Sequence, residues 1–237
     1  MTLTTGPDPV EAIKTSPIPF NLYRDVHKGL RYALFELVTA VGSTDCADPQ
    51  ARGAAVDRVH AVIRLLTEHH DHEDSFLQPI IRANAPALAA ALEEGHAEVE
   101  HDLVEIELRT DRFAMSAGPE ATMAGLELYG FLSLFVGRYL AHMGLEEGAV
   151  MAALRETTSV EDLLGVQAAV RSSVPPSTMC RFIEVLMPAL NPEERTEVLG
   201  GMYAGAPPEI FELFRATTEA ALEPAEYEAL AHRIGLV

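Results

Sequence analysis

Residues 65–79, LLTEHHDHEDSFLQP, alternate histidines with carboxylates between His69 and Asp74. An α-helix turns by about 100° per residue, so His69 and Glu73 lie about 40° apart on one helical face. The same face carries the apolar residues Val62, Leu66, Phe76 and Ile80, a stripe that is expected to face a core. Because an unpaired ionised group is costly in a protein interior, the face either holds paired charges or binds a metal ion.

The same spacing of histidine and glutamate recurs twice further along the chain. The two later pairs are His96–Glu100 and His142–Glu146, each on an apolar stripe of helical period. His27 lies on the stripe of the segment that precedes the first pair. The strings HHDHEDSFLQP and AHMGLEEGAVM share one pattern of histidine, carboxylates and a later apolar residue, which indicates an internal repeat.

Helical periodicity predicts four long amphipathic helices, over residues 21–41, 52–81, 86–109 and 120–156. No segment before residue 157 alternates with the period of two that is typical of strands. The fold class is therefore all-α, and the short connections predict an up-down-up-down four-helix bundle. We assign residues 1–19 to an N-terminal arm, 20–156 to the bundle and 157–237 to a C-terminal subdomain of short helices packed on the bundle.

Composition and charge exclude several classes of partner. The chain has 237 residues, 48% of them apolar, and a formal net charge of −19. It has no basic cluster, so nucleic acid and anionic membrane are not expected partners. Cys46 and Cys180 lack the spacing of a metal or redox motif. We recognise no signal peptide and no membrane-spanning run, so we expect a cytoplasmic protein of undetermined oligomeric state.

Seven side chains that can bind metal lie on predicted core faces. They are His27, His69, Glu73, His96, Glu100, His142 and Glu146. Burying this many ionisable groups without a metal costs more than their mutual pairing usually returns, while a whole domain is stable by only about 5–15 kcal/mol. Seven nitrogen and oxygen donors exceed one tetrahedral zinc site. The set predicts two octahedral ions that share bridging carboxylates, with iron as first choice and manganese as second.

Other histidines fall off these stripes. His60 is expected on the surface, and His70 and His72 are expected either to be exposed or to support the metal-binding side chains. His101 lies five positions after His96, about 140° around an ideal helix, so it should point elsewhere.

The order of these motifs on four successive helices resembles the hemerythrin-like (HHE cation-binding) domains, over about residues 20–156. The resemblance implies a non-heme diiron centre, with oxo and carboxylate bridges, that meets O2 or a related small ligand. Carried over by position, the implied ligands are His27, His69, Glu73, His96, His142 and Glu146. Oxygen-carrying members have a histidine four residues after the one on the third helix, where this chain has Glu100, with His101 next to it as an alternative. They also place a carboxylate five residues after the histidine of the fourth helix, which makes Glu147 an alternative to Glu146.

Glu100 is the residue on which we base the choice between O2 activation and reversible ligand binding. A carboxylate in place of an imidazole stabilises higher oxidation states of iron, which favours an oxidase, an oxygenase or a peroxide-consuming protein, with a small-molecule substrate. The alternative is a module that reversibly binds or senses O2, NO or iron, with residues 157–237 as its output element. Tyr23 and Tyr139, about one turn from His27 and His142, could hydrogen-bond a bound oxygen species, or could simply pack in the core.

Overall fold

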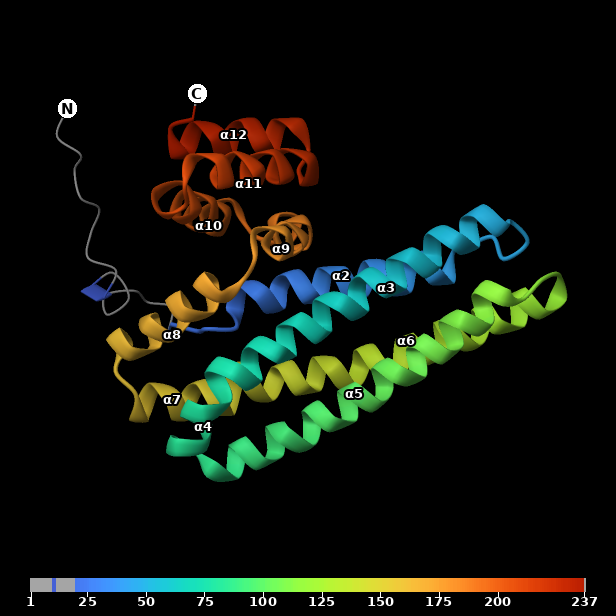
Figure 1. Cartoon of the computed structure of the whole chain (residues 1–237), viewed down its shortest axis with the longest axis horizontal. Coiled ribbons are helices and arrows are strands. Elements are labelled where there is room, and N and C mark those ends of the chain that lie inside the picture. The colour runs from blue at the N-terminus through green and yellow to red at the C-terminus, as the bar shows by residue number, and fades with distance from the viewer. Residues whose placement is uncertain (1–9, 12–19, 237) are drawn as a thin grey trace.

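Every element in the described part of the chain is a helix (Figure 1). The computed structural model describes residues 10–11 and 20–236, so most of the predicted arm at residues 1–19 lies outside the described residues. The all-α prediction is confirmed for the described residues. The elements are α2 (Arg24–Gly42), α3 (Pro49–His72), η1 (Glu73–Leu77), α4 (Gln78–Asn84), α5 (Pro86–Met115), α6 (Pro119–Leu145), η2 (Glu146–Val150), α7 (Met151–Thr157), α8 (Val160–Ser173), α9 (Pro176–Ala189), α10 (Pro192–Gly205), α11 (Pro208–Ala221) and α12 (Pro224–Ile234).

Local sequence explains where several helices begin. The Asp48 carboxylate accepts a hydrogen bond from the backbone N–H of Gln50 at the start of α3, and Pro49 occupies the first helical position. At the start of α10, Asn191 and Glu194 form a reciprocal capping box. Each cap satisfies backbone N–H groups that have no partner within the helix.

The four longest helices surround one interior. Helix α2 packs against α3 and α6, and α5 packs against the same two helices. Contacts of α2 with α5, and of α3 with α6, are much sparser, which places the helices of each of these pairs diagonally across the interior. Side chains from all four helices can therefore converge on one layer between them.

Apolar side chains form two separate clusters inside these helices. One cluster contains Leu30 of α2, Leu66 of α3 and Val99 of α5. The other contains Leu77 of η1 and Leu92 of α5, together with residues of η2 and α7. Along each of the four long helices, the histidines and glutamates that were predicted to bind metal lie between a residue of one cluster and a residue of the other, and we call them the polar layer. The polar layer is thus enclosed by hydrocarbon on two sides.

Two π-helical turns, η1 and η2, interrupt the long helices directly at Glu73 and Glu146. A π-helical turn accommodates an extra residue and so shifts the register of the residues that follow. The predicted core positions Phe76 and Ile80 are accordingly only partly buried and pack at the edge of the second cluster, whereas Leu77 and Ile81 are buried. Before the turn, the predicted positions Val62 and Leu66 are buried as expected.

The C-terminal helices α9 to α12 lie over one side of α2 and α3 (Figure 1) and have an apolar cluster of their own. Helix α9 packs closely on α2 at Gly29, where an added Cβ would lie 3.2 Å from Cα of Leu186. Helix α8 contacts η1, the turn that begins at Glu73. The C-terminal helices therefore contact the part of the bundle that carries the polar layer.

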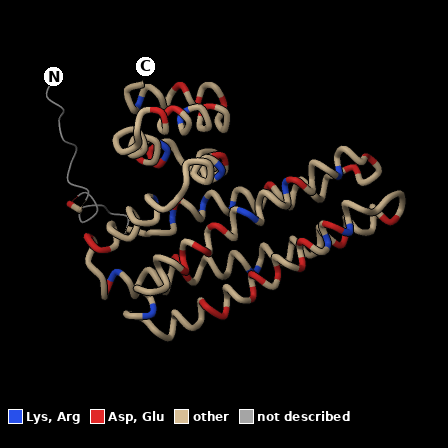
Figure 2. Tube along the Cα trace, viewed as in Figure 1, with Lys and Arg blue, Asp and Glu red and all other residues tan. Residues whose placement is uncertain are grey.

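Acidic side chains are distributed along most of the helices, whereas Lys and Arg occur mostly singly (Figure 2). None of the helices in the described part combines the length and the apolar character that a membrane crossing requires. The division of the chain at residues 19 and 156 stays a prediction.

Candidate metal centre

Six of the seven predicted ligands have side chains that are buried in the polar layer. They are His27, His69, Glu73, His96, His142 and Glu146, and none of these side chains is more than 7% exposed. The seventh, Glu100, is exposed on α5, and so is its alternative His101. The expectation that Glu100 faces the core is therefore corrected, because the buried stripe of α5 passes through His96 and Val99 instead.

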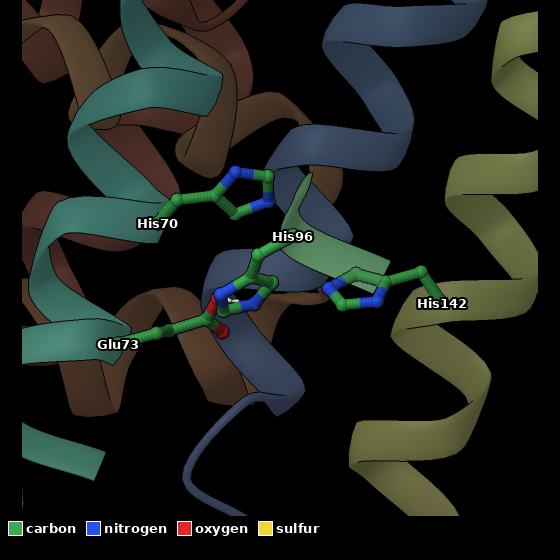
Figure 3. A group of neighbouring side chains, drawn as sticks. All are labelled: His70, Glu73, His96 and His142. Carbon is green, nitrogen blue, oxygen red and sulfur yellow. Dashed lines mark ion pairs between the residues drawn. The ribbon is translucent and has the colours of Figure 1, made fainter. Parts of the chain in front are cut away.

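The buried side chains form two groups that share one carboxylate. One group consists of His27, His69 and Glu73, and the other of His70, Glu73, His96 and His142. In each group, one candidate ligand atom per residue lies within 4.8 Å of all the others. Figure 3 shows the second group, with side chains from three helices directed toward one another. Glu73 is positioned to contact a cation in either group.

Glu146 also reaches both groups. Its Oε2 lies 3.5 Å from Nε2 of His27, and its Oε1 lies 3.3 Å from Nε2 of His142. Glu73 has the corresponding contacts, with Oε1 3.0 Å from Nε2 of His69 and Oε2 3.5 Å from Nε2 of His96. The two glutamates that start the π-helical turns therefore lie between the same two sets of imidazoles.

His70 is the member of the layer that sequence reasoning missed. It is 5% exposed, although we expected it to be exposed or only to support the ligands. His70 and Glu73 are three positions apart, about 60° on an ideal helix, and His69 lies on the other side of Glu73. The adjacent pair His69–His70 before Glu73 was the available signal, because two imidazoles can flank one carboxylate on a single helical face.

The residue after each central glutamate contacts a histidine of another helix. Oδ1 of Asp74 lies 2.9 Å from Nδ1 of His96, and Oε1 of Glu147 lies 3.0 Å from Nδ1 of His27. Arg31 donates two hydrogen bonds to Glu147, at 2.6 and 3.0 Å. Glu147 is therefore placed to orient His27, whereas Glu146 occupies the centre of the layer.

Charges in the layer shift the pKa values of its histidines in opposite directions. Burial alone would lower the pKa of His27, but Glu147 and Glu73 raise it to about 9. Burial opposes the same effect at His96, where Glu146 and Glu73 raise the pKa to about 10. Burial and then the neighbouring His69 lower the pKa of His70 to about 3. Without a metal, protons on His27 and His96 therefore balance buried carboxylate charge.

The carboxylates respond in the matching direction. Burial would raise the pKa of Glu73, but His69 and then His27 hold it well below its usual range. Burial also opposes ionisation of Glu147, yet His27 and Arg31 lower its pKa to about 2. Both groups are anionic at neutral pH, as a metal ligand or its hydrogen-bond partner must be.

Several buried atoms of the layer lie close to other members of the layer, yet form no hydrogen bond of acceptable geometry with the described residues. They are Oε1 and Oε2 of Glu73, Nε2 of His96, Nε2 of His142 and Oε2 of Glu146. In addition, Nε2 of His27 and Nε2 of His69 face each other at 3.2 Å. Buried polar atoms without a hydrogen-bond partner are rare and costly, and two facing imidazole nitrogens need a proton or a cation between them. The donor set therefore fits bound metal.

Tyr139 and Tyr23 pack against the layer. A hydrogen bond of 3.3 Å joins Oη of Tyr139 to Nε2 of His70, and the ring centroids of Tyr23 and His27 are 5.0 Å apart. Burial, followed by the charges of Glu73 and Glu146, raises the pKa of both tyrosines, so their hydroxyls remain protonated. The predicted interaction with a bound oxygen species stays a prediction.

The fold and this layer define an all-helical protein with a His/Glu cluster that could bind metal cations. The family model described as "Hemerythrin HHE cation binding domain" matches residues 19–154. The chain therefore belongs to the hemerythrin HHE cation-binding family, as its motif order predicted. Searches of the curated proteins and of the solved structures found no match.

Proposed function

We propose that the layer binds two iron ions and that the protein is a non-heme diiron protein that reacts with O2 or peroxide. The observation that carries this proposal is the sharing of Glu73 by two groups of buried donors. One ion would be held by His27 and His69, and the other by His70, His96 and His142. Glu73 and Glu146 would bridge the two ions.

The chemistry of the donors supports iron. Imidazole and carboxylate without thiolate suit iron, and manganese is the second choice. Pairs of carboxylate-bridged metal ions in the interior of helix bundles are an established arrangement. We also propose that α2, α3, α5 and α6 form the up-down-up-down bundle, which their neighbour relations support.

Glu100 does not favour O2 activation as an additional carboxylate ligand, because its side chain is exposed. When bound, a pair of iron ions supplies the redox chemistry with which O2 or hydrogen peroxide reacts. The chain contributes a buried layer enclosed by two apolar clusters, which limits access of bulk water. An oxidoreductase remains the preferred function because His69 and Glu73 also line a cavity much larger than O2 needs.

Reversible binding or sensing of O2, NO or iron is the second candidate. It is favoured by five imidazoles in the donor set and by the contact of α8 with η1, which would connect the centre to the C-terminal helices. Hydrogen exchange distinguishes the candidates. A sensor should change the protection of α8 to α12 when its ligand binds, whereas identical exchange in both states would count against sensing.

Metal analysis with an absorption spectrum tests the proposal directly. We expect two iron ions per chain after anaerobic loading, and bands of a diferric centre after exposure to air. Turnover of O2 or peroxide by the reduced protein, at a rate that an organic substrate increases, would support the oxidoreductase. A single bound ion, or no preference for iron or manganese over zinc, would contradict the diiron proposal.

A further inference from the structure

A cavity of about 510 Å³ lies between the bundle and the C-terminal helices. Its lining includes residues of α2, α3 and η1 on one side and residues of α8, α9, α10 and α11 on the other. Tyr23, His69 and Glu73 form part of its surface. The cavity therefore extends from the candidate metal centre into the interface with the C-terminal helices.

Ion pairs join the C-terminal helices to the bundle. Nζ of Lys28 lies 2.6 Å from Oε1 of Glu194, which ties α2 to α10. Arg181 of α9 forms an ion pair with Glu68 of α3. Protein interiors contain few voids larger than a water molecule, so a space of this size between packed helices exceeds ordinary packing gaps. Its volume falls in the range of about 300–1,000 Å³ that is usual for ligand sites.

The walls contributed by the C-terminal helices are mainly apolar. They include Val166, Val170, Met179, Met202, Ile210 and Phe214. Methionine side chains adapt to the shape of an apolar ligand. Most of the ionisable side chains, including Tyr23, His69 and Glu73, come instead from the side of the bundle. This arrangement resembles an organic-ligand site, in which apolar walls give affinity and a few polar groups give orientation.

The charged residues that line the cavity indicate which ligands it can bind. Arg171 is the single Lys or Arg among the described residues that line the cavity. Asp25 and Glu73 also line it. A ligand with several phosphates would meet repulsion from these carboxylates without enough cations to bind it. The lining therefore favours a molecule that is neutral or singly charged.

We propose that the cavity binds a small apolar organic molecule beside His69 and Glu73, and that α8 to α11 thereby supply the substrate site of the centre. The location beside a metal centre rests on the function proposed above, whereas binding in the cavity does not. The C-terminal segment thus has a role that the matched family domain, residues 19–154, does not include.

The test uses the full chain and the neutral fluorophore N-phenyl-1-naphthylamine. We expect saturable binding at one site per chain in the metal-free protein. Met202→Glu places a carboxylate in the apolar wall and should weaken this binding at least tenfold. Met123→Glu is the matched control, because Met123 is 55% exposed on α6 and does not line the cavity. Binding that does not saturate, or equal affinity in the two variants, would overturn the proposal.

A second variant covers the case in which Met202→Glu does not fold. Gly201 lines the cavity, and a Cβ added there meets no atom within 4 Å, so Gly201→Leu should be tolerated. It should reduce the affinity for the fluorophore, whereas Gly130→Leu, also open in α6, should not. Equal affinity in Gly201→Leu and Gly130→Leu would contradict the proposal.

Iron loading separates this inference from the proposed function. Bound fluorophore should be quenched in the iron-loaded protein relative to the metal-free protein, because the dye would lie beside the centre. Retained dye binding in a chain that takes up no iron would contradict only the diiron proposal. Retained iron with no dye binding would contradict only the cavity proposal.

Discussion

Oδ1 of Asp74 lies 2.9 Å from Nδ1 of His96, and Asp74 directly follows the central glutamate Glu73. Glu147 repeats the relationship after Glu146, with its carboxylate 3.0 Å from Nδ1 of His27. A hydrogen bond at Nδ1 fixes the imidazole tautomer and directs the lone pair of Nε2 toward the layer. The repeated Glu-acid pair thus supplies one carboxylate to the layer and a second that orients a histidine of another helix.

Removing these orienting carboxylates should weaken metal binding without removing a ligand. We expect Asp74→Asn and Glu147→Gln each to lower iron affinity by about 10–100-fold. Competition with a chelator measures the affinity. Asp71→Asn is the control, because Asp71 is exposed on the same helix as the layer residues. Affinities equal to that of the control would show that the two carboxylates do not orient the histidines.

Substitution of His70 tests whether His70, which is buried in the layer, or Glu100, which the sequence predicted, is a metal ligand. His70 belongs to only one of the two donor groups. His70→Ala should therefore lose one of the two iron ions preferentially, whereas Glu100→Ala, at an exposed position, should retain both. Iron content per chain is the measurement. Loss of iron in Glu100→Ala with none in His70→Ala would reverse the assignment.

Stability of the metal-free protein should depend on pH in a defined way. The pKa values of His27 and His96 are raised from 6.5 to about 9 and about 10, so above pH 6.5 the folded chain keeps protons that the unfolded chain releases. The free energy of unfolding should therefore fall as the pH rises from 6.5 to about 10. The pKa of His70 is lowered to about 3, so below pH 6.5 the unfolded chain binds a proton at His70 that the folded chain does not bind. The free energy of unfolding should therefore also fall as the pH decreases below 6.5.

Urea denaturation in the presence of a chelator, between pH 5 and pH 10, checks this dependence. A stability maximum near pH 6.5 is expected. Iron replaces the protons on His27 and His96, so loading the protein at pH 7.5 should release protons into a weakly buffered solution. Stability that rises between pH 7 and pH 9 would contradict the raised pKa values.

Gly95 allows the His142 ring to lie against α5. A Cβ added at Gly95 would lie 2.8 Å from Nδ1 of His142, so Gly95→Ala should displace the imidazole and reduce iron affinity. Gly130→Ala adds a methyl group to open space on α6 and should instead stabilise the chain by about 0.5–1 kcal/mol through helix propensity. Thermal unfolding and iron titration of the two variants make the comparison. Unchanged iron affinity in Gly95→Ala would mean that the ring has room to move.

The helical period of the sequence predicted most of the helices in the bundle. The predicted helix over residues 86–109 is observed as Pro86–Met115, and the one over 21–41 as Arg24–Gly42. From the π-helical turn η1 onward, Leu77 and Ile81 are buried, whereas the expected core residues Phe76 and Ile80 are only partly buried. A π-helical turn departs from the period of 3.6 residues, so an ideal helical period cannot locate it.

The sequence by itself determined an all-helical chain whose histidines and glutamates recur at a spacing of four residues, because that spacing creates a face on any α-helix. Only the tertiary structure decided that Glu146 and not Glu147 enters the layer, that His70 joins it, and that Glu100 and His101 remain exposed. The reason is physical. A single helix specifies directions about its own axis, whereas a binding site depends on how four helices are rotated and displaced relative to one another, and packing sets those quantities.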